Sequence, residues 1–64
     1  MSKNIELEYA IGDTVRLVDT MITGTITGIC LYMYAENSYL LDYVDTIGMS
    51  QENWFGYHRI ESLQ

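Results

Sequence analysis

Proline is absent from this 64-residue chain, and basic residues are scarce. Three Lys and Arg stand against nine Asp and Glu, which gives a net charge of −6. A charge of this sign disfavours contact with phosphate backbones and anionic lipid, and the basic patch typical of nucleic-acid-binding proteins is missing. We therefore expect no direct binding to nucleic acid or to a membrane.

Cysteine and histidine occur once each, as Cys30 and His58. A single cysteine excludes an intramolecular disulfide, which favours a reducing cytoplasm over secretion. Metal-ligand spacings such as CxxC and HxxxH are absent, so the sequence predicts no metal site and no cofactor. No spacing pairs a nucleophile with a base, and a chain this short has few side chains to spare for a catalytic cleft. We expect a noncatalytic protein rather than an enzyme.

Long apolar runs are also missing. No stretch approaches the roughly 18 apolar residues needed to cross a bilayer. The segment that follows Met1 lacks the apolar core of a signal peptide. Neither a membrane anchor nor a secretion signal is expected, and both absences agree with a cytoplasmic location.

Short β-strand patterns follow one another along the chain, with single glycines and acidic turns between them. Gly28 interrupts the longest of these patterns, where a bulge or bend would turn both Ile26 and Ile29 toward the core. The predicted strands are 5–11, 14–18, 25–34, 39–44, 50–55 and 60–63. Their number, their spacing and the lack of a helical pattern predict an all-β fold, a small five- to six-stranded barrel. A single domain spans residues 1–64, with residues 1–8 as an N-terminal strand or arm.

Five short segments follow one another along this chain: Tyr9-Ala-Ile-Gly-Asp-Thr-Val-Arg-Leu, Gly24-Thr-Ile-Thr-Gly-Ile, Tyr39-Leu-Leu-Asp-Tyr-Val-Asp45, Trp54-Phe55 and Arg59-Ile-Glu61. Together they resemble the small SH3-like barrels of the KOW and Tudor type. The resemblance implies an SH3-like fold and a bacterial or bacteriophage source, and it implies binding rather than catalysis. The predicted loops depart from the basic loops of KOW-type nucleic-acid binders, because they carry Asp19, Glu36, Asp45 and Glu52.

Aromatic side chains and the few arginines supply the candidate binding residues. Trp54 and Phe55 are consecutive strand residues and point to opposite faces, so one of them is expected to be exposed. The same segment continues to Tyr57 and Arg59, where a ring and a guanidinium could hold a flat or phosphorylated ligand. The predicted binding residues are Arg16, Tyr39, Tyr43, Trp54, Phe55, Tyr57 and Arg59.

Tyr39 and Tyr43 have two further interpretations. Their alternation fits half-buried structural residues, and the resemblance to Tudor-type modules implies an aromatic cage made with Trp54 and Phe55.

Three functions remain open from the sequence. The first is a phage-type binding protein that contacts a host protein through a Tyr-rich surface, as a homo-oligomer. The second is an anti-defence sponge that sequesters a nucleotide second messenger between subunits, with Arg16 and Arg59 holding its phosphates. The third is an acidic mimic of DNA. The first is the interpretation that the sequence favours.

Overall fold

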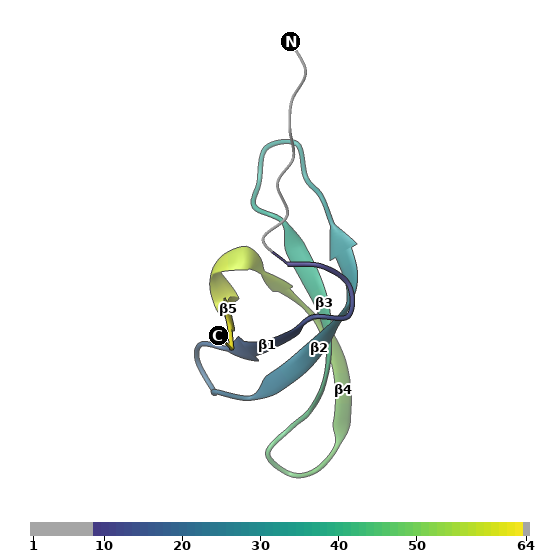
Figure 1. Ribbon diagram of the computed structural model, residues 1–64, viewed down its shortest axis with the longest axis vertical. Helices are drawn as coiled ribbons and strands as arrows, with labels where there is room; N and C mark the ends of the chain where they lie inside the picture. Colours follow the sequence, from purple (N-terminus) through teal and green to yellow (C-terminus); the bar gives the residue numbers. More distant parts are fainter. Residues whose placement is uncertain (1–8, 64) are drawn as a thin grey trace.

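A computed structural model describes residues 9–63 as a single antiparallel sheet of five strands (Figure 1). The strands are β1 (Thr14–Leu17), β2 (Thr23–Cys30), β3 (Ser38–Val44), β4 (Ser50–Gly56) and β5 (Ile60–Ser62). One 3-10 turn, η1 (Tyr57–Arg59), joins β4 to β5, and the described residues contain no α-helix. The predicted all-β, single-domain fold is confirmed.

The strands lie in the order β4-β3-β2-β1-β5, and every neighbouring pair is antiparallel. The sheet coils, so that β5 lies across the molecule from β3 and β4, and η1 leads from the end of β4 to β5 (Figure 1). No strand ladder joins β4 to β5 within residues 9–63, so the sheet is open. The expected closure into a barrel is therefore corrected: β5 has three residues and pairs with β1 alone.

Alternation along the strands places one apolar face of the sheet in the core. Val15 and Leu17 in β1 are 1% and 6% exposed, and Tyr39 and Leu41 in β3 are fully buried. Ile26 from β2 and Ile60 from β5 complete this buried cluster. The predicted inward faces of β1 and β3 are confirmed.

The predicted irregularity near Gly28 is a shift in the β2–β3 register between Ile26 and Gly28. Thr27 is the additional residue, because Ile26 pairs with Leu41 and Gly28 with Leu40. The shift lets two nearby β2 residues reach the core, since Ile26 is buried and Ile29 packs against the buried cluster. The expectation for this strand is confirmed.

Two predicted strand boundaries are wrong. Tyr9 to Ile11 form a bend and a turn instead of a strand, because Asp13 N donates to Ala10 O (3.0 Å) and Gly12 has a φ of 98°. Residues 5–8 of that predicted strand, and the arm predicted over 1–8, lie outside the described residues. The strand predicted over 25–34 ends at Cys30, where its pairing with Ser38 is the last of the β2–β3 ladder.

The loop before β3 and the turn after it project from opposite ends of the molecule (Figure 1). The β2–β3 loop spans residues 31–37, and the β3–β4 turn spans residues 45–49. Asp45 organises the turn, since its carboxylate accepts hydrogen bonds from Ile47 N (3.1 Å) and Met49 N (2.9 Å). Gly48 has a φ of 86°, a left-handed conformation that glycine adopts without strain. Among residues 9–63, no helix is both long and apolar enough to cross a membrane.

Candidate functional site

The predicted binding residues do not form one surface, because β4 divides them between the two faces of the sheet. Leu40 pairs with Trp54 and Tyr39 with Phe55, so Trp54 shares the outer face with Leu40 and Phe55 shares the inner face with Tyr39. Trp54 is 53% exposed, whereas Phe55 is half-buried and packs on the core. The expectation that one of these two rings is exposed is confirmed.

Tyr39 lies in the core and offers no surface to a ligand. Its side chain is fully buried, and its ring meets the ring of Tyr9 edge to face, with centroids 5.4 Å apart. The binding role predicted for Tyr39 is therefore corrected, since the inward alternation of β3 makes it a structural residue. Its hydroxyl has no hydrogen-bond partner among the described residues.

Tyr43, Phe55 and Arg59 do come together, in a groove at the end of β3 beside the β1–β2 turn. The groove has a volume of about 300 Å³, and Asp19 and Asp45 contribute to its lining. The rings of Tyr43 and Phe55 meet edge to face with centroids 5.8 Å apart. We call these five residues the Tyr43 groove.

The charged side chains of the Tyr43 groove already form ion pairs or hydrogen bonds within the protein. Arg59 Nη2 lies 2.7 Å from the Asp19 carboxylate. The pKa of Asp45 is lowered, first by the hydrogen bond from Met49 N and further by bonds from the Gln51 side chain and from other turn amides. A carboxylate held in this way stays ionised at neutral pH. The groove therefore has one more carboxylate than guanidinium and disfavours an anionic ligand.

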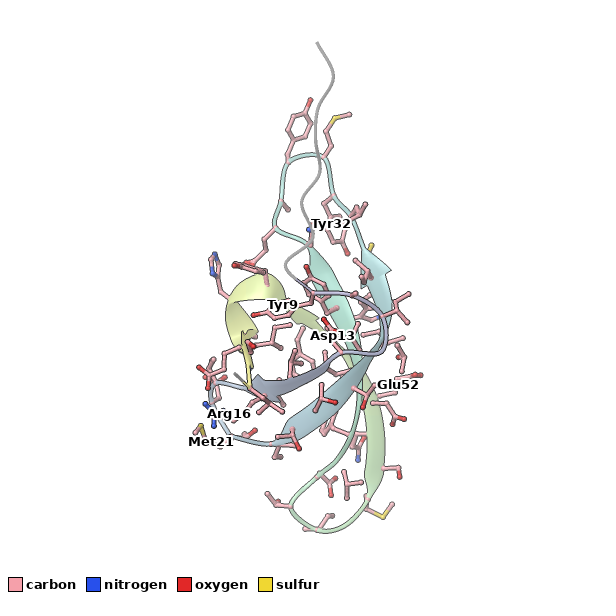
Figure 2. The ribbon with its side chains drawn as sticks, viewed as in Figure 1. Tyr9, Asp13, Arg16, Met21, Tyr32 and Glu52 are labelled. Atoms are coloured by element: carbon pink, nitrogen blue, oxygen red, sulfur yellow. The ribbon has the colours of Figure 1, made fainter. Side chains whose placement is uncertain are left out.

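Arg16 lies away from the Tyr43 groove, on the outer face of β1. Its guanidinium contacts Glu61 on the neighbouring strand β5, with Nη2 2.6 Å and Nε 2.7 Å from the same carboxylate oxygen. Figure 2 shows the Arg16 side chain near the edge of the molecule, next to the β1–β2 turn that carries Met21. Each arginine of the described residues thus has a carboxylate partner.

Tyr57 belongs to the packing around η1. Its half-buried ring lies 6.0 Å from the ring of Tyr9 and 5.2 Å from that of His58, centroid to centroid. Glu36 holds the turn to the β2–β3 loop, because its carboxylate accepts a hydrogen bond from His58 N (3.3 Å). Tyr57 covers the core more than it faces solvent.

The most exposed aromatic side chain, that of Tyr34, lies where the sequence predicted a strand. The aromatic loop, as we call Leu31, Tyr32, Met33 and Tyr34, directly follows the end of β2. Tyr34 is 94% exposed and Met33 78%, while Leu31 and Tyr32 are about half exposed at 49% and 52%. Figure 2 shows Tyr32 at the base of this loop, which projects beyond the sheet. The pKa of the Tyr32 phenol is raised, chiefly by a hydrogen bond with the Cys30 side chain.

Sequence reasoning missed the aromatic loop because Leu-Tyr-Met-Tyr has the composition of a strand. The available signal was the length of the run: residues 25–34 exceed the usual strand of about five or six residues. A second exposed apolar group occupies the β3–β4 turn at the opposite end, with Val44 56%, Ile47 81% and Met49 57% exposed.

No group of three or more His, Cys, Asp and Glu side chains among residues 9–63 is placed to hold a metal ion. No protein-family model matches the chain, and neither a curated protein nor a solved structure shows significant similarity to it. The SH3-like resemblance and the bacterial or bacteriophage source that it implies stay predictions.

Proposed function

We propose that the protein is a noncatalytic binding protein that contacts a protein partner through the aromatic loop. The observation that carries this proposal is the exposure of Met33 and Tyr34, at 78% and 94%, at the tip of a loop anchored by two strands. Tyr and Met are enriched in the centres of protein–protein interfaces, where their burial supplies much of the binding free energy. A soluble fold gains nothing from leaving such side chains in water.

The charge of the chain indicates the chemistry of the partner. The net charge is −6, and Glu36 lies in the β2–β3 loop two residues after the aromatic loop. A negative net charge favours a partner whose own apolar patch is bordered by basic residues. We therefore propose a basic-rimmed protein surface as the partner, with the host protein of a bacteriophage as the class that the resemblance implies.

The alternative of a nucleotide sponge has less support. It relied on Arg16 and Arg59 to hold phosphate, and both guanidinium groups are engaged, with Glu61 and Asp19. Phosphate binding at either arginine would displace a carboxylate from it, which lowers the gain from the new contact. The cytoplasmic location, the anti-defence role and the acidic mimicry of DNA stay predictions without a structural observation behind them.

Site-specific photo-crosslinking in bacterial cells tests the proposed function. A photoreactive phenylalanine analogue replaces Tyr34 in one variant and Ile47 in a control, because Ile47 is 81% exposed at the opposite end of the molecule. The expected result is a discrete covalent adduct with another protein from position 34 and none of that mass from position 47. The same adducts from both positions, or no adduct from position 34, would overturn the proposal.

A further inference from the structure

One long edge of the sheet lacks the usual protection against pairing with another chain. Within residues 9–63, β4 pairs with β3 on one side and with no strand on the other. Edge strands are commonly protected by proline, lysine, a bulge or very short length. Strand β4 has seven residues, contains neither proline nor lysine, and pairs with β3 without a register shift. Its only charged side chain is that of Glu52.

The hydrogen bonds at the two ends of the β3–β4 ladder identify the backbone groups that face outward. Asp45 N donates to Met49 O (2.9 Å), and Tyr57 N donates to Asn37 O (2.9 Å). Hydrogen-bonded pairs alternate along an antiparallel ladder, so the odd-numbered residues of β4 bond to β3. The residues whose N–H and C=O groups point to the open edge are Ser50, Glu52, Trp54 and Gly56.

We propose that β4 is a dimerisation edge, on which two copies of the chain join their sheets by antiparallel β4–β4 pairing about a two-fold axis at Asn53. Two-fold pairing of identical strands is necessarily antiparallel, and the same surface serves both copies. In this register Glu52 pairs with Trp54 of the second copy, and Ser50 pairs with Gly56 of the second copy. All the outward backbone groups of β4 then find partners, in about eight hydrogen bonds.

Charge placement favours this register over the one with its axis at Glu52. An axis at Glu52 would set two carboxylates directly opposite each other, which is destabilising. An axis at Asn53 separates these carboxylates to diagonal positions about 7–8 Å apart. It also places each Glu52 across from the indole of the second copy's Trp54, which is 53% exposed in the single chain. The pairing covers the most exposed ring of the outer face.

This inference does not rest on the proposed function, because β4 and the aromatic loop are separate residues with separate tests. The chain has one tryptophan, so the intrinsic fluorescence of Trp54 reports on the β4 edge alone. Sedimentation equilibrium is expected to show a monomer–dimer equilibrium. The Trp54 emission is expected to shift to shorter wavelength over the same concentration range.

A matched pair of substitutions at one position tests the backbone pairing. Glu52→Pro removes an outward N–H from each copy and leaves the β3–β4 ladder intact, whereas Glu52→Gln removes the same negative charge and keeps that N–H. The loss of two hydrogen bonds is expected to raise the dimer dissociation constant at least about tenfold for Glu52→Pro. The Gln variant is expected to stay dimeric.

A cysteine pair tests the register, and it decides alone where Glu52→Pro fails to fold. In a Cys30→Ser background, Asn53→Cys puts two thiols across the axis at a non-hydrogen-bonded site, within disulfide reach. Ser50→Cys is the control, because six residues along the strands separate its thiols by about 20 Å. Diamide is expected to cross-link the first variant and not the second. A monomer at all concentrations, a dimer unaffected by Glu52→Pro, or equal cross-linking of both cysteine variants would overturn the proposal.

Discussion

The buried hydroxyl of Tyr39 predicts that its removal stabilises the protein. Tyr39 is fully buried, and its Oη has no hydrogen-bond partner among the described residues. In the unfolded chain this hydroxyl is hydrated, so folding costs its desolvation without a compensating bond. Leaving a buried polar group unsatisfied costs about 1–3 kcal/mol. Tyr39→Phe keeps the ring and its edge-to-face contact with Tyr9 while it removes that cost.

We expect Tyr39→Phe to raise the free energy of unfolding by about 1 kcal/mol. For a domain of this size the gain corresponds to a rise in melting temperature of about 4–8 °C. Tyr43→Phe is the matched control, because the Tyr43 hydroxyl accepts a hydrogen bond from Asn53 Nδ2 at 2.9 Å. Its loss is expected to leave stability unchanged or lower it by about 0.5 kcal/mol.

Thermal and urea unfolding followed by circular dichroism measure both variants. The slope with urea is expected to stay unchanged, since neither substitution alters the surface exposed on unfolding. A loss of more than about 0.5 kcal/mol for Tyr39→Phe would refute the reasoning. That result would mean that the hydroxyl is hydrogen-bonded in solution, for instance to a buried water.

Two further predictions concern the ends of β2 and β3. Gly24→Ala is expected to lower the free energy of unfolding by about 1–3 kcal/mol, because a Cβ there would lie 3.1 Å from both Asp42 O and Tyr43 Cβ. Thr25→Ala, on the exposed face, is the control. Equal unfolding curves for the two variants would contradict the close approach of the strands at Gly24. The lowered pKa of Asp45 means that its contribution to stability is present above the ordinary carboxyl pKa and is lost as the pH falls through the lower folded-state pKa. Asp45→Asn is therefore expected to flatten the acid limb of the stability–pH profile below about pH 4, and an unchanged acid limb would contradict the role of the turn hydrogen bonds.

Local alternation was sufficient to predict most of the sheet. Val15 and Leu17, and likewise Tyr39 and Leu41, repeat at the period of a strand and point to one buried face. The bulge near Gly28 followed from an isolated glycine within a strand pattern. These features depend on residues that are close together in the sequence, so they can be predicted from the sequence alone.

The aromatic loop and the open edge depend on pairing between distant residues. Strand β2 ends where Ser38 begins β3, and nothing in Leu-Tyr-Met-Tyr marks that limit. The sheet stays open because β5 stops at Ser62 and pairs with β1 alone, a matter of strand length and register. The engagement of Arg59 with Asp19 likewise joins two turns that are far apart in the sequence.

The central claim is that the aromatic loop binds a protein partner, and the most direct measurement is the affinity of that partner for loop variants. With the partner identified by cross-linking from position 34, calorimetry compares Met33→Ala and Tyr34→Ala with the control Ile47→Ala. All three side chains are at least 78% exposed, so unfolding curves are expected to stay within about 0.5 kcal/mol of the parent. The account predicts a dissociation constant at least about tenfold higher for the loop variants and unchanged for Ile47→Ala. Equal affinity for all three variants and the parent would contradict it.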